Sequence, residues 1–110
     1  MIPVAPCITA LVTAPDAETA RKIVRAALEP KLAACANIVP QIESHYWWEG
    51  KLEQSSEVLI IFKTTVKMQM ALRACVLANH PYQVAEFITQ PIEFGSDAYL
   101  AWIRQNVAVL

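Results

Sequence analysis

Residues 34–63 alternate in a way that predicts one long β-hairpin, turned at Glu49-Gly50. Ahead of the turn, Tyr46 and Trp48 share one face and Trp47 lies on the other, as neighbouring side chains of a strand do. After the turn the chain becomes continuously apolar over VLIIF, residues 58–62. Such a run is typical of a strand that is buried on both faces. We therefore expect the base of the hairpin to lie in a core and its polar, aromatic tip to project beyond it.

Ahead of the hairpin the chain predicts a strand and a helix. The strand covers Cys7–Val12, a short apolar and β-branched run. Asp16 is a suitable N-cap for the helix that follows. We expect this helix to end near Leu28, because Pro30 disfavours helical backbone in the residue before it.

After the hairpin the chain predicts another helix and a fourth strand. Thr64 or Thr65 is expected to cap the helix, which runs to about Ala78. Asn79 is expected to end it in a left-handed conformation. The strand is expected over Val84–Thr89.

The predicted order is β-α-β-β-α-β plus a C-terminal helix capped by Ser96, which is the split β-α-β arrangement of a ferredoxin-like α+β sandwich. Residues 1–110 then form a single domain, since two domains of this length would lack sufficient core. Both crossover helices are expected on one face of a four-stranded sheet. Charged residues make up 17% of the chain, whereas a typical domain has about 25%. The uncovered face needs a partner to bury it, and the low charge fraction fits that expectation.

Composition also excludes several classes of function. Nine Lys and Arg against ten Asp and Glu give a net charge of -1, and no basic stripe is dense enough to bind nucleic acid. No apolar run is long enough for a transmembrane helix, and the first residues do not resemble a secretory signal. The three cysteines form no C-x-x-C pair. We therefore expect a cytoplasmic protein with neither a nucleic-acid nor a membrane partner.

The chain has no P-loop, nucleophile elbow or metalloprotease motif, so we do not expect an enzyme. His80 follows the second predicted helix, where it is either an ordinary surface histidine or a metal ligand or acid/base group in a cleft between subunits. Tyr82 and Glu86 follow in the same segment and are expected to line that cleft. Lys63 ends the apolar run, so it either lifts its ammonium group out of the sheet or faces an anion in the cleft.

Cysteine and aromatic side chains supply the remaining candidates. Cys75 lies on the apolar face of the second helix, where a buried, inert thiol is the default and weak metal ligation is the alternative. Aromatic residues on the hairpin and the last helix are expected to anchor contacts between subunits; they are Tyr46, Trp47, Trp48 and Trp102.

Six segments occur in order between about Cys7 and Gln105: TAPD, KLAACANIVPQIES, YWWEGKLEQ, FKTT, HPYQVAE and YLAWI. In order and in spacing they together resemble the CutA family, the divalent-cation tolerance proteins. The resemblance implies a ferredoxin-like fold and a tight homotrimer, in which hairpins and sheet edges pair between subunits, with a shape related to PII signalling proteins. It also implies a link to copper tolerance, with copper or another divalent cation as ligand.

In members of the family linked to copper, the suggested ligands are a cysteine just before T-A-P and a pair of histidines just before P-Y. The corresponding residues here are Val12 and Asn79-His80, so only His80 carries over. Cys75 precedes His80 by five residues, which is not the spacing that aligns two ligands on one helix face. We therefore expect weak copper binding that depends on His80, alone or with Cys75.

Two classes of function stay open at this point. The first is a cytoplasmic homotrimer linked to divalent-cation tolerance, with weak metal binding at His80. The alternative is a PII-like trimeric sensor of small molecules, or a scaffold for other proteins, that uses clefts between subunits. In that case an anion is expected near Lys63, Tyr82 or Glu86.

Overall fold

The computed structural model describes residues 5–109. Within this range four strands form one sheet: β1 Cys7–Ala14, β2 Cys35–Trp48, β3 Lys51–Thr65 and β4 Ile88–Pro91. The same range contains the α-helices α1 Ala17–Leu28, α2 Gln69–Asn79 and α3 Asp97–Gln105, and a short 3-10 turn, η1 Val66–Met68, that leads into α2. The strand order is β2-β3-β1-β4 and every pair is antiparallel. The ferredoxin-like α+β fold predicted from the sequence is therefore confirmed.

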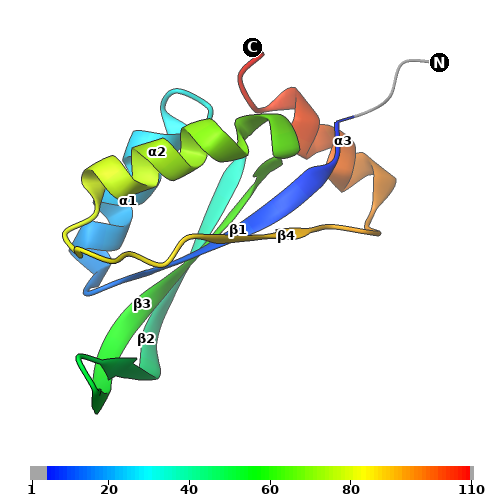
Figure 1. The fold of residues 1–110 in the computed structure, drawn as a ribbon. Coiled ribbons are helices and arrows are strands. Elements are labelled where there is room, and N and C mark those ends of the chain that lie inside the picture. The colour runs from blue at the N-terminus through cyan, green and yellow to red at the C-terminus, as the bar shows by residue number, and fades with distance from the viewer. Residues whose placement is uncertain (1–4, 110) are drawn as a thin grey trace.

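The helices are distributed unevenly around the sheet. α1 and α2 lie side by side over one face, and α3 lies at the end of the sheet where β1 begins (Figure 1). The β2–β3 hairpin extends well beyond the helices, so the molecule is elongated, with extents of 52 × 26 × 22 Å (Figure 1). This arrangement confirms the projecting hairpin. No helix in residues 5–109 is both long enough and apolar enough to cross a bilayer.

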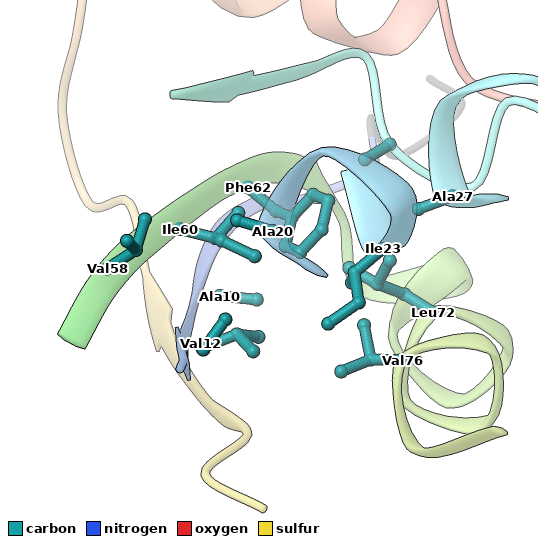
Figure 2. Close-up of a cluster of buried hydrophobic side chains, with 12 residues drawn as sticks. Ala10, Val12, Ala20, Ile23, Ala27, Val58, Ile60, Phe62, Leu72 and Val76 are labelled. Carbon is teal, nitrogen blue, oxygen red and sulfur yellow. The ribbon is translucent and has the colours of Figure 1, made fainter. Parts of the chain in front are cut away.

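The core lies between the sheet and its two covering helices (Figure 2). Phe62 of β3 and Ile23 of α1 are among its largest fully buried side chains, and Val76 of α2 joins them. The β1 side chains that face the helices are small, as Ala10 and Val12 illustrate. Fully burying a side chain the size of Phe, Ile or Val stabilises the fold by about 1.5–3 kcal/mol.

Most predicted boundaries are confirmed. A carboxylate oxygen of Asp16 accepts a hydrogen bond from the backbone N–H of Thr19 at 2.7 Å, which caps α1, and that helix ends at Leu28. Ser96 caps α3 in the same way. At the hairpin tip, Glu49-Gly50 both have positive φ, 49° and 78°, the conformation that a tight two-residue turn requires.

The predicted caps of α2 are wrong at both ends. Thr64 and Thr65 continue β3, and the Thr64 hydroxyl instead donates to the Leu32 carbonyl at 2.7 Å. Asn79 stays helical, and its side-chain amide donates to the Cys75 carbonyl one turn earlier at 2.8 Å. In both cases a hydrogen bond inside the fold replaces the local capping bond that the residue type favours.

The fourth strand is shorter than predicted. It begins at Ile88, opposite Leu11 of β1, and not at Val84. Farther along β1, the Thr13 carbonyl is already bonded to the ring of His80. That bond removes the acceptor that a longer β4 would need, so residues 84–87 form a loop beside the sheet.

Candidate functional site

A cleft of about 620 Å³ opens between the β2–β3 hairpin, the end of β1 and the loop that joins α2 to β4. Small-molecule sites in proteins commonly measure about 300–1,000 Å³. The lining residues are Thr13 and Pro15 after β1, Ser44, His45, Tyr46, Trp48, Ser55, Ser56 and Glu57 on the hairpin, and Tyr82, Gln83, Val84 and Glu86 on the loop. The cleft is therefore the candidate site.

His80 fixes the start of the loop against the sheet. Its Nε2 lies 2.7 Å from the Thr13 carbonyl oxygen, and its Nδ1 lies 3.1 Å from the backbone nitrogen of Tyr82. Since a carbonyl only accepts and an N–H only donates, Nε2 carries the ring proton and Nδ1 is the acceptor. Both ring nitrogens are thus occupied, and the imidazole ties the loop to β1.

Tyr82 makes the second connection, a hydrogen bond from the loop to the hairpin. Its hydroxyl donates to Oε2 of Glu57 at 2.8 Å. Burial, and then the hydrogen bond to Glu57, raise the pKa of Tyr82 above its ordinary value, so the phenol stays protonated. The Tyr82 ring also lies against the His80 ring, with 4.7 Å between centroids.

The charge of the cleft is negative. Glu57 and Glu86 both line it, and its lining includes no Lys or Arg. Burial raises the pKa of Glu86, and the negative charge of Glu57 raises it further. The charge of Glu57 therefore makes Glu86 harder to ionise.

The structure separates the residues that were predicted to share a cleft. Tyr82 and Glu86 line this one, within a single chain, but Lys63 does not. Lys63 lies farther along β3, where its ammonium group contacts the side-chain oxygen of Asn37. Because its neighbour Phe62 points into the core, Lys63 lies on the opposite face of the sheet from α1 and α2. The expected anion site near Lys63, Tyr82 and Glu86 is therefore not formed within one chain.

The positions at which the sequence resemblance predicts copper ligands offer few donors. Val12 is fully buried in the core, and the Asn79 amide is bonded to its own helix. His80 has both nitrogens in use. Burial raises the pKa of the Cys75 thiol, which disfavours the thiolate that a metal requires. Within residues 5–109, no group of three or more His, Cys, Asp or Glu side chains is arranged to share a metal ion.

The aromatic residues predicted to anchor subunit contacts are all exposed in the single chain. Tyr46 and Trp48 face the cleft, whereas Trp47, 73% exposed, lies on the other side of the hairpin opposite Leu52. Trp102 stacks on Tyr99 of the same helix, with 5.5 Å between ring centroids. These rings belong to separate surfaces, so they do not form one continuous patch within a chain.

Sequence reasoning missed Glu57, the most buried charged group of the cleft. Its side chain is only 7% exposed. The available signal was its position, directly before the apolar run of residues 58–62. An acidic residue at the edge of such a run faces either solvent or a partner, and the hydroxyl of Tyr82 is that partner.

Comparisons with known proteins place the chain in a family. Residues 8–106 match the family model "CutA1 divalent ion tolerance protein". The chain is 45% identical over 100 residues to the divalent-cation tolerance protein CutA of Escherichia coli, covering 91% of this chain and 89% of that one. It is 49% identical over 96 residues to human Protein CutA, covering 87% of this chain but only 54% of the human protein, so it spans about half the length of that relative.

A solved structure agrees with the sequence comparisons. The periplasmic divalent cation tolerance protein CutA from Archaeoglobus fulgidus superposes with a TM-score of 0.89 at 40% identity, over 93% of this chain and 99% of that one. With this match of fold and the family match over residues 8–106, the chain belongs to the CutA1 family of divalent ion tolerance proteins.

Proposed function

We propose that this chain acts as a CutA-type homotrimer that contributes to tolerance of divalent cations, copper among them. The observation that carries the assembly is the sheet face opposite α1 and α2. On that face Leu11 and Ile61 are only half-buried and Ile88 is 52% exposed. An apolar sheet face of this kind is stable in water when another copy covers it.

Both edges of the sheet also favour assembly. β2 and β4 are its outer strands, and each has one side with unpaired backbone groups. Pairing of the β4 edge of one copy with the β2 edge of the next is a head-to-tail contact, which closes into a ring when the rotation allows it. The projecting hairpin carries Trp47, 73% exposed on the side away from the cleft, towards such a neighbour, where desolvated aromatic side chains dominate the binding energy.

We infer that the chain binds metal weakly and is not an enzyme. A copper ion at His80 must displace either the Thr13 carbonyl or the Tyr82 N–H from the imidazole. The names of the matched family and relatives describe tolerance and no reaction. A cytoplasmic location stays a prediction. The three free thiols are consistent with it, whereas the Archaeoglobus fulgidus relative is described as periplasmic.

Two measurements on untagged protein test this function. Sedimentation at micromolar concentration should show a species of three 12.2 kDa chains, and a folded 12.2 kDa species would contradict the trimer. Competition titration of copper against a chelator of known affinity should show weak binding that His80→Ala abolishes. The matched control is His45→Ala, which removes an exposed histidine paired with Glu43 at 2.7 Å. Tight binding of one copper per chain that survives His80→Ala would contradict the metal assignment.

A further inference from the structure

We propose that the cleft binds an organic cation, an ammonium or guanidinium group carried on an apolar body. The lining residues described above all belong to one chain, and an organic ligand there goes beyond the trimer and the weak metal binding proposed above. Its evidence is the charge of the cleft, the burial of Glu57 and the aromatic rings that line the same space.

Glu57 lacks a positive partner. Its side chain is nine-tenths buried, and the Tyr82 hydroxyl bonds one of its carboxylate oxygens, Oε2. Within residues 5–109, Oε1 has no hydrogen-bond partner, no Lys or Arg forms an ion pair with the carboxylate, and no fully buried side-chain oxygen is left without a partner, so Oε1 is open to the cleft. A buried carboxylate is unfavourable unless charge and hydrogen bonds compensate it. Because Glu57 also lines the cleft, a cationic N–H donor in the cleft would supply both.

Glu86 makes the same preference stronger. It lines the cleft across from the hairpin, and its pKa is raised by burial and by the charge of Glu57. A positive group between the two carboxylates would relieve their repulsion, whereas an anion would increase it. The cleft is therefore selective for cations.

The walls indicate that the cation is organic. Tyr46, Trp48 and Tyr82 line the cleft beside the carboxylates. Aromatic faces attract ammonium and guanidinium groups and also cover the apolar part of such a molecule. A volume of about 620 Å³ is far larger than a single metal ion needs, and no set of three metal-binding side chains is present in residues 5–109. An organic cation therefore fits the negative charge, the aromatic lining and the volume of the cleft.

The cation has two sources, a free solute or a Lys or Arg side chain of a neighbouring copy. We assign it to a free solute, because the cleft has the volume of a small-molecule site and a single side chain would leave much of it unfilled. The experiment below separates the two sources.

Calorimetric titration of the 110-residue chain with benzylammonium chloride tests the assignment. Benzyl alcohol is the neutral probe of the same shape, and benzoate is the anionic one. Native protein should bind benzylammonium and neither of the others. Glu57→Gln should weaken binding by about tenfold or more, since a charged hydrogen bond is lost. Glu86→Gln, which changes an exposed side chain, should also weaken it and remains informative if Glu57→Gln fails to fold.

Glu53→Gln is the matched control, because Glu53 lies on the same strand but does not line the cleft. The Glu53→Gln variant should bind benzylammonium with the same affinity as the native protein. No binding by native protein, equal binding of benzyl alcohol, or equal loss in Glu53→Gln would overturn the proposal. So would displacement of benzylammonium by copper chloride in a one-to-one ratio, which would assign the cleft to inorganic ions.

Sedimentation of the same samples tests the alternative source, in which a Lys or Arg side chain of a neighbouring copy fills the cleft. If native protein binds no benzylammonium and Glu57→Gln dissociates the assembly, a neighbour fills the cleft and the solute assignment is wrong. If native protein is monomeric yet binds benzylammonium as expected, the trimer is wrong and the cation site stands.

Discussion

Tyr82 and Glu57 are 25 residues apart in the chain, yet the Tyr82 hydroxyl donates to a Glu57 carboxylate oxygen at 2.8 Å. This hydrogen bond joins the loop after α2 to the β2–β3 hairpin. The His80 ring makes the parallel connection from the same loop to Thr13 of β1, at 2.7 Å. Two side chains of one short segment therefore hold the loop that forms one wall of the cleft.

Tyr82→Phe should lower the free energy of unfolding by about 1–3 kcal/mol, since the buried carboxylate of Glu57 loses its donor. Urea denaturation at neutral pH measures this change. Tyr46→Phe is the control, because the Tyr46 hydroxyl lies 3.3 Å from Ser55 in an exposed position and should contribute less. Equal losses of unfolding free energy in the two variants would show that the hydrogen bond to Glu57 stabilises the fold no more than the exposed contact of Tyr46 does.

Glu86→Gln should stabilise the protein at neutral pH, with an advantage that disappears in acid. Burial and the charge of Glu57 raise the pKa of Glu86 above its ordinary 4.5, and Tyr82 stays protonated nearby. The folded state then binds the proton more tightly than the unfolded state, so this group's contribution to stability falls as pH rises from 4.5 through the raised value. Thermal unfolding of both proteins from pH 4 to pH 8 measures this difference in stability. A stabilisation by Glu86→Gln that grows as the pH falls would contradict the prediction.

The fold could be predicted from the sequence because its signals are local and consistent with one another. The alternation around Glu49-Gly50, the Asp16 cap and the Pro30 stop each act over a few residues. The wrong predictions at Thr64 and at the start of β4 depend on distant partners. Thr64 bonds the Leu32 carbonyl across the fold, and no local pattern reports that bond.

The candidate site was only partly predictable for the same reason. Tyr82 and Glu86 occur in one segment, so the sequence placed them together. Glu57 joins them only through the hairpin's position beside the loop, which depends on tertiary structure. Lys63 does not line this cleft within one chain, so its grouping with Tyr82 and Glu86 in a cleft between subunits stays a prediction.

His80→Ala should loosen the loop without unfolding the core. Both nitrogens of the ring are bonded, so its removal leaves the Thr13 carbonyl and the Tyr82 N–H without partners. Amide hydrogen exchange at Tyr82 should become faster, whereas exchange in α1 should stay unchanged. His45→Ala, on the exposed part of the hairpin, should leave both unchanged. Undiminished protection of the Tyr82 amide in His80→Ala would show that the ring does not hold the loop.

Ile61→Lys should dissociate the assembly while the chain stays folded. Ile60 is fully buried in the core, so Ile61 points to the opposite face, where it pairs with Leu11 of β1 and is half-buried in the single chain. In a single chain the lysine can extend its ammonium group into water, but in a covered interface it would be buried without a partner. The dissociation constant should rise by more than about tenfold, as for other central interface positions. Met70→Lys is the matched control, since Met70 is 63% exposed on α2 in the helical layer. Sedimentation with circular dichroism measures assembly and folding together. An Ile61→Lys protein that assembles like Met70→Lys would show that this face of the sheet is not the interface.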